Sequence, residues 1–154
     1  MKHALLVLLV LGLCAGSSSA QSMREVKVYF QNVTRELHDQ NAGDSTAFPV
    51  AAYGVPRSVD TRYSIRQALV QLLKGPTPTE RDSGYTSGLD GLRLVRLTVY
   101  RHRATIHLRG RLQLAGVLSE PRMRLQVKRT MLQFPRIRHV SLIINGRRSF
   151  NDLR

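Results

Sequence analysis

The sequence predicts an α+β domain in which two helices pack on one face of a mainly antiparallel sheet, in the order β-β-α-β-β-α-β. Three observations support this fold class. Several short segments alternate apolar and polar residues, which is typical of strands with one buried face. Two longer segments carry apolar residues at the spacing of an amphipathic helix. Turn residues such as Gly, Pro, Asn and Asp separate these segments, as expected of a layered domain.

The first twenty residues have the three parts of a secretory signal peptide. Lys2 precedes the apolar run of residues 4–13, and Ser18 and Ala20 occupy the small positions before a cleavage site. The apolar run is shorter than the about 20 residues that a transmembrane helix needs. We therefore interpret residues 1–20 as a signal peptide and expect an exported protein, extracellular or in the cell envelope.

Cys14 leaves a second possibility for the N-terminus. Residues 11–14 resemble a bacterial lipobox, in which the cysteine carries a lipid after cleavage, although Leu13 stands where that box has Gly, Ala or Ser. A lipid anchor at Cys14 is therefore the alternative to a freely exported protein. Because Cys14 is the only cysteine, neither mature form has an internal disulfide bond.

The first part of the mature chain predicts two strands separated by a loop. Residues 26–30 alternate between apolar and polar side chains, as in a strand with one buried face. Residues 32–46 are polar without a sustained period, so we expect a variable loop. Residues 48–57 are extended, and Pro49 and Pro56 predict an edge strand because proline cannot donate to a sheet ladder.

An amphipathic helix over residues 63–74 follows. Its apolar stripe consists of Ile65, Ala68, Leu69, Leu72 and Leu73. Asp60 or Thr61 can cap the start, and Lys74-Gly75-Pro76 ends the helix with a cation, a flexible residue and a residue that cannot continue it. Residues 77–80 then form a capping box with Pro at the first helical position, which predicts a short second helix.

The next segment predicts a β-hairpin whose apolar face consists of Val95, Leu97, Val99, Ala104, Ile106 and Leu108. Pairing Val99 with Ile106 closes the hairpin around His102-Arg103. In this register Arg96 stands opposite Arg109. Like-charge repulsion disfavours such a pair unless solvent or a bound anion relieves it.

A second long helix and a final strand complete the domain. Ser119 can cap the helix, and Pro135 ends it. Its apolar stripe consists of Met123, Val127, Met131 and Phe134. Residues 140–144 alternate in a last strand closed by Asn145-Gly146. Residues 149–154 form a polar tail.

Four segments carry a family resemblance: Val26-Lys27-Val28-Tyr29-Phe30, Leu72-Leu73-Lys74-Gly75-Pro76-Thr77, Gln133-Phe134-Pro135 and Asn145-Gly146. The second and third of them are distinctive in combination. In this order the four segments resemble the GerMN domain of bacterial sporulation, germination and envelope proteins. The resemblance covers residues 25–148. It implies a compact α/β sandwich outside the cytoplasmic membrane, acting as an interaction or structural module without established catalysis.

Two departures from the family pattern concern the hairpin. Its turn lacks the Asp-Gly-like pair that is usual in the family. Its returning strand has His107 and Arg109 where family members often show an acidic residue and then Ser. The resemblance therefore implies that a partner recognised through this strand differs from the usual one.

Positive charge is concentrated in the second half of the chain. The protein has 24 Lys and Arg residues against ten Asp and Glu residues, and from Gly91 onward only Glu120 and Asp152 are acidic. Guanidinium groups suit anionic polymers or an acidic protein. A solvated Arg-rich surface without a dedicated ligand, reflecting genome composition, fits the same pattern. The candidate face on or near the solvent side of the hairpin consists of Arg93, Arg96, His107, Arg109 and Arg111.

No arrangement of residues predicts a catalytic, cofactor or metal site. The mature sequence has no nucleophile elbow and no cysteine–histidine pair. His102 and His107 are expected at a turn and on a strand, without a third ligand. Asp82 and Asp90 fit solvated turns better than a paired acid–base site. We therefore expect no enzyme activity and no cofactor.

The sequence thus predicts an exported, non-catalytic GerMN-type domain that acts by protein–protein interaction or assembly in the cell envelope. The expected partner is another envelope protein or a second copy of the chain, with no small-molecule substrate. The alternative is electrostatic binding of an anionic envelope polymer or nucleic acid through the Arg-rich face. Salt separates these hypotheses, because polyanion binding weakens steeply as ionic strength rises.

Overall fold

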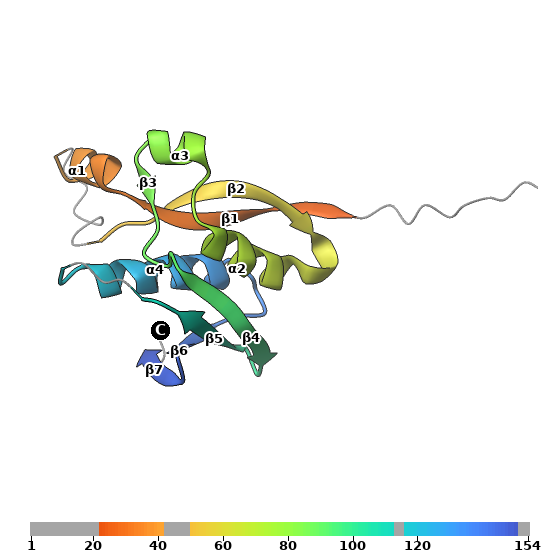
Figure 1. The fold of residues 1–154 in the computed structure, drawn as a ribbon. Coiled ribbons are helices and arrows are strands. Elements are labelled where there is room, and N and C mark those ends of the chain that lie inside the picture. The colour runs from red at the N-terminus through yellow and green to blue at the C-terminus, as the bar shows by residue number, and fades with distance from the viewer. Residues whose placement is uncertain (1–21, 42–49, 113–115, 151–154) are drawn as a thin grey trace, which may run out of the picture.

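The computed structural model describes residues 22–41, 50–112 and 116–150 (Figure 1). The predicted signal peptide, Cys14 and part of the predicted polar tail lie outside these residues. Helices α2 (Ser64–Lys74) and α4 (Ser119–Leu132) lie between two β-sheets, as Figure 1 shows. The α+β class, the two long helices and the mainly antiparallel pairing are confirmed. The strands, however, are divided between two sheets where the sequence predicted one.

The first sheet has three antiparallel strands in the order β2-β1-β3. They are β1 (Met23–Asn32), β2 (Tyr53–Asp60) and β3 (Tyr85–Thr86). Val26, Val28 and Phe30 of β1 are buried, so the predicted alternation places one face of this strand in the core. β2 is an edge strand, which accommodates Pro56 as expected.

The second sheet has four strands in the order β4-β5-β6-β7. They are β4 (Leu92–Tyr100), β5 (Arg103–Gly110), β6 (His139–Ile144) and β7 (Arg147–Phe150). The β5–β6 pair is parallel, with α4 in the connection, and the other pairs are antiparallel. β7 overlaps the start of the segment that the sequence assigns to a polar tail. It forms because Asn145 and Gly146 both have positive φ, which turns the chain back onto β6.

The corner between the first sheet and α2 follows the sequence closely. Asp60 accepts a hydrogen bond from the Arg62 N–H and caps a short 3-10 helix, η2 (Thr61–Tyr63), that leads into α2. Gly75 ends α2 with φ of 76°. The capping box of Thr77 and Glu80 then begins α3 (Pro78–Asp82).

Polar side chains attach α4 to the first sheet. The apolar stripe is buried as predicted, but Gln126 and Thr130 are fully buried as well. Thr130 Oγ1 accepts a hydrogen bond from the Tyr29 N–H of β1 at 3.1 Å. Gln133, the C-cap of α4, accepts one from the Lys27 N–H through its Oε1 at 2.8 Å. These bonds satisfy backbone donors of β1 that its own strand pairing leaves to other partners.

The predicted hairpin register is wrong. Leu97 pairs with Ile106 and Val99 with Ala104, around a two-residue turn of Arg101 and His102 that have φ of 44° and 63°. This is the positive-φ geometry of a tight hairpin turn, formed here without glycine. A bulge at the other end of β4, between Leu94 and Arg96, shifts the register again, so Arg96 does not stand opposite Arg109.

Two further expectations need correction. The start of the predicted loop at residues 32–46 contains the end of β1 and helix α1 (Val33–Asn41). This helix is fixed by tertiary contacts, because Glu36 is buried and bonded to Arg122 of α4. The N-cap of α4 is Leu118 without a side-chain bond, and Ser119 is the first helical residue rather than the cap.

Candidate functional site

The outer surface of the β4–β5 hairpin brings together four of the predicted basic residues. Alternate residues of β5 are buried against the helices, so the residues between them point to the opposite side of the sheet. The register sets Arg109 opposite Arg93, and His107 opposite Arg96. Directly opposed residues of an antiparallel pair share a face, so these four side chains gather on one surface. We call them the hairpin basic face.

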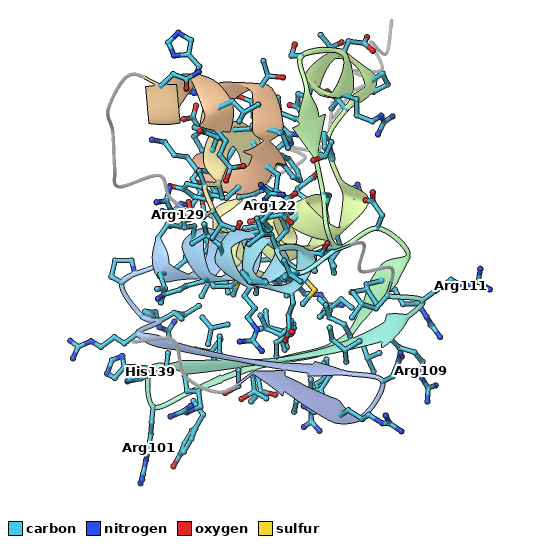
Figure 2. The ribbon with its side chains drawn as sticks, turned by 90° about the vertical axis from the view of Figure 1, so that its left-hand side faces the viewer. Arg101, Arg109, Arg111, Arg122, Arg129 and His139 are labelled. Atoms are coloured by element: carbon cyan, nitrogen blue, oxygen red, sulfur yellow. The ribbon has the colours of Figure 1, made fainter. Side chains whose placement is uncertain are left out.

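Arg111 is near this surface but not on a strand. It follows the last residue of β5 and is exposed. Figure 2 shows Arg109 and Arg111 at one end of the four-stranded sheet, with Arg101 at the opposite end beside the hairpin turn. Arg111 therefore extends the positive surface beyond the strand end.

The parallel strand β6 lies beside this surface and adds His139 to the same side of the sheet, a residue that sequence reasoning missed. The register sets His139 beside Arg103 and Ser141 beside Thr105. Arg103 Nη1 donates to Ser141 Oγ at 3.4 Å. The alternation of β6 is visible in the sequence, but its neighbour is not, because parallel pairing leaves no local turn signal.

The charge on this face is uncompensated within its own sheet. No Asp or Glu occurs in the sequences of β4, β5, β6 or β7. Carboxylates elsewhere in the described residues pair with other arginines, as in Glu36–Arg122, Asp60–Arg62, Glu80–Arg57 and Glu120–Arg124. The arginines that stand opposite each other therefore favour an anionic partner, because like charges across a strand pair repel.

The edge of the same sheet is open along β4. Among the residues that the structure describes, no strand pairs with the outer edge of β4. Val95, Val99 and Tyr100 on this strand are 56%, 37% and 66% exposed. The bulge at Val95 interrupts the pleat, while residues 96–100 keep a regular register with β5. An exposed, partly apolar edge strand is a template for pairing with another chain.

Titratable groups with shifted pKa values lie away from this surface. Hydrogen bonding from Arg57 lowers the pKa of Glu80, and burial together with the hydrogen bond to Asp39 raises the pKa of Tyr53 to about 12. Both residues belong to structural contacts at α3 and at the start of β2. Within residues 22–41, 50–112 and 116–150, no three His, Cys, Asp or Glu side chains cluster as metal ligands.

The predicted histidine positions agree with the structure. His102 is in the hairpin turn, where its Nδ1 lies 3.3 Å from the Arg136 carbonyl oxygen, and His107 is on the hairpin basic face. Asp82 and Asp90 are both exposed, as expected for solvated positions. No helix in the described part of the chain is both long and apolar enough to span a bilayer.

A family model described as "Germane: Sporulation and spore germination" matches residues 27–149. The fold is similar to that of the tandem GerMN domains of the sporulation protein GerM from Bacillus subtilis, with a TM-score of 0.55 and 20% identity. That match covers 88% of this chain and 44% of the tandem protein, so the chain spans less than half of that relative. The first GerMN domain of GerM gives a TM-score of 0.53 with 17% identity, over 84% of this chain and 86% of that domain. No curated protein sequence matches the chain.

Proposed function

Since the chain belongs to the Germane family of sporulation and spore germination domains, we propose that it is an exported domain acting by protein–protein contact in the bacterial cell envelope. The signal-peptide pattern of residues 1–20 supports export. Membership of this sporulation and germination family, whose resemblance implies a module without established catalysis, supports a role in contact rather than in chemistry. The tandem GerMN domains of the sporulation protein GerM have a similar fold.

The open edge of β4 is the observation that carries this proposal. Strand addition to a free edge supplies a row of main-chain hydrogen bonds, and exposed apolar side chains add burial on contact. Val95, Val99 and Tyr100 provide that apolar surface, and the adjoining hairpin basic face provides charge. This combination favours a protein partner that presents an extended segment.

A different protein fits this edge better than a second copy of the chain. The chain has a formal net charge of +14, and Arg93 and Arg96 lie on the edge strand itself. Two copies joined through β4 would bring these arginines together, which costs free energy in proportion to their burial. A partner with carboxylates along its strand would replace that repulsion by attraction.

An envelope extract from the source organism tests the contact. The variant Val95→Glu/Tyr100→Glu removes apolar surface from the edge and adds charge that repels a carboxylate-bearing strand, so it should abolish capture of the partner that the unmodified chain binds. Val117→Glu is the control, because Val117 is 91% exposed and lies outside the strands. Capture that survives the edge variant, or that Val117→Glu disrupts equally, would contradict the proposal. Cell fractionation with mass measurement of the N-terminus tests export and distinguishes a cleaved signal peptide from a lipid at Cys14.

The hairpin basic face supports a second candidate function, electrostatic binding of an anionic polymer. Arg93, Arg96, His107 and Arg109 share one surface on a sheet without carboxylates. Single-strand nucleic acid binders also use stacking aromatics, for which this face offers only Tyr100 among the described residues. Nucleic acid is therefore a weaker fit than a phosphate-rich wall polymer.

Ionic strength separates the two functions. Binding to a polyanion should fall steeply as salt rises, and Arg96→Gln/Arg109→Gln should reduce the salt slope by roughly two contacts. Contact through the apolar edge should change little over the same range. Failure to bind wall phosphate polymer, nucleic acid or anionic vesicles at low salt would eliminate this second function.

A further inference from the structure

A groove opens beside β4, on the inner side of the strand. It has a volume of about 390 Å³ and lies between the end of β4, the start of α2 and the segment after α4. The end of β4 and the start of α2 occupy the same end of the molecule in Figure 1. The apolar residues that line the groove are Ile65, Leu97, Val99, Phe134 and Pro135.

The rim of this groove is strongly basic. Arg24, Arg62, Arg66 and Arg136 line it, and no Asp or Glu is among the lining residues. Arg62 is bonded to Asp60 at 3.4 Å, and the Arg24 guanidinium lies 5.7 Å from the Phe134 ring centroid. The structure records no ion pair between Arg66 or Arg136 and any other described residue. An apolar floor below unneutralised guanidinium groups selects a ligand with both apolar and anionic groups.

The groove is continuous with the open edge of β4. Leu97 and Val99 line the groove and belong to residues 96–100, the regular part of the edge strand. An extended backbone paired with this edge would send every second side chain toward the groove and the others toward the outer face. Arg96 occupies that outer face. Only a polypeptide can use both the backbone edge and the groove, which separates it from a lipid or a polyphosphate.

We infer that the groove and the β4 edge together bind an extended acidic segment of a partner protein by strand addition. Where the segment pairs with β4 it would alternate apolar residues, which enter the groove against Leu97 and Val99, with Asp or Glu residues, which face Arg96 on the outer side. Acidic residues where the segment runs past the paired stretch would meet the arginine rim of the groove. This inference rests on the proposed protein–protein function and names the chemistry of its partner. A second copy of this chain does not fit, because pairing two β4 strands would bring their arginines together and like charges repel.

Synthetic peptides provide the direct test. The probe is a capped octapeptide that alternates Val and Glu, titrated into the full mature chain while backbone amide shifts are followed by NMR. We expect saturable binding with shifts concentrated in residues 96–100 and at the start of α2. The same peptide with Lys in place of Glu should bind at least about tenfold more weakly, since a tenfold change needs only one or two favourable charge contacts.

Backbone methylation separates strand addition from simple charge attraction. Methylating alternate amides of the peptide removes the N–H groups on one edge and leaves every side chain in place. Of the two methylated forms, the one blocked on the edge that faces β4 should lose binding, while the other should retain it. Equal binding of both forms, or no binding of the parent peptide at millimolar concentration, would overturn the inference.

Two matched protein variants locate the site. Arg66→Gln/Arg136→Gln removes two charges from the groove rim and should weaken binding of the acidic peptide by about tenfold or more. Arg111→Gln/Arg147→Gln removes two charges at the other end of the sheet and should leave binding within about twofold. If the two variants weaken binding equally, the peptide responds only to net charge and the inference fails. Capture of an envelope partner could depend on the β4 edge but not on Arg66 and Arg136. In that case this inference fails, while the proposed protein–protein function keeps its support.

Discussion

Arg57 of β2 holds Glu80 of α3 through two parallel hydrogen bonds, Nη1 to Oε1 at 2.7 Å and Nη2 to Oε2 at 2.6 Å. The Glu80 carboxylate also accepts the Thr77 N–H at 2.9 Å. Both partners of the ion pair are mostly buried, with side chains 15% and 18% exposed. One carboxylate therefore joins an edge strand to the cap of a five-residue helix.

Glu80→Gln should lower the free energy of unfolding at neutral pH by about 1–3 kcal/mol, because one buried charge-assisted contact is lost. Hydrogen bonding from Arg57 lowers the pKa of Glu80 below its ordinary value of 4.5. The stabilisation is thus fully present above pH 4.5 and is lost as pH falls through the lowered pKa. Denaturant unfolding at several pH values measures both effects.

The matched control for this contact is Asp82→Asn, since Asp82 is an exposed carboxylate on the same helix. It should change stability by less than about 0.5 kcal/mol. The gap between the unmodified chain and Glu80→Gln should narrow on acidification. A gap that stays constant down to low pH would show that Glu80 does not act through its charge.

The Tyr53 hydroxyl should lose its proton at a higher pH than an ordinary tyrosine. This hydroxyl donates to Asp39 Oδ2 at 2.8 Å. Burial is the largest cause and this hydrogen bond the next, and together they raise the pKa of Tyr53 from 10.0 to about 12. The folded state favours the neutral phenol, so this contribution to stability is present below pH 10 and is lost as pH rises toward 12. Ultraviolet titration of tyrosinate in Tyr53→Phe should lack the late step. Tyr100→Phe keeps the Tyr53–Asp39 pair and should retain it.

The corner from Asp60 to Glu80 could be predicted from sequence because its signals are local. A cap, a Gly-Pro stop and a capping box each involve residues within a few positions of one another. The stripe of α2 was equally visible, since its spacing reports which side of the helix is buried. Local rules of this kind extend to the type and order of the main elements, which the structure confirms, although helix α1 and strands β3 and β7 were not predicted.

The division into two sheets could not be predicted, because it depends on distant polar contacts. Thr130 of α4 and Gln133 at its C-cap bond to β1 backbone groups about a hundred positions earlier, and neither side chain is apolar. Helix α1 was missed for the same reason, since Glu36 acts through Arg122. Periodicity of apolar residues carries no information about such bonds.

The sequence predicts which residues lie on the hairpin basic face, but not which of them stand opposite each other. Alternation in β5 correctly placed His107 and Arg109 on the outer side. The bulge and the glycine-free turn changed which residues stand opposite them, so Arg109 faces Arg93 rather than Arg96. The groove beside β4 could not be predicted, because its arginines come from three segments of the chain that are far apart in sequence.

Removing Glu36 should be one of the most damaging substitutions in the described core. Its Oε2 accepts from Arg122 Nη2 at 3.0 Å and its Oε1 accepts from the Ala51 N–H at 3.2 Å, while the residue is 2% exposed. Glu36→Ala leaves the largely buried Arg122 guanidinium without its ion-pair partner and should lower the free energy of unfolding by about 3–5 kcal/mol. Glu36→Met/Arg122→Met should recover most of this loss in denaturant unfolding, because no charge is then left unpaired. A double variant as unstable as Glu36→Ala would show that the unpaired guanidinium is not the source of the loss.

Gly110 should tolerate no side chain. A Cβ built there would lie 2.0 Å from the Gly91 carbonyl oxygen, at φ of +144°. Gly110→Ala should therefore destabilise by about 3–5 kcal/mol, because both backbones must move. Gly146→Ala is the control: its φ is +78°, but nothing lies within 4 Å of its Cβ, so its cost should be nearer 1 kcal/mol. Equal thermal shifts for the two variants would contradict the steric explanation.

The hairpin turn carries strain that glycine should relieve. His102 has φ of 63°, and its carbonyl oxygen accepts the N–H groups of Arg138 and His139. A left-handed backbone costs about 1–2 kcal/mol of stability for a residue with a Cβ. Glycine instead lowers stability by about 0.4–1 kcal/mol, because it gives the unfolded chain more conformational entropy. The first effect is larger, so His102→Gly should be more stable than His102→Ala by about 0.5–1 kcal/mol. Both variants lack the imidazole and keep the carbonyl bonds, so their difference in denaturant midpoint isolates the backbone. An alanine variant at least as stable as the glycine variant would mean that the turn is not strained at this position.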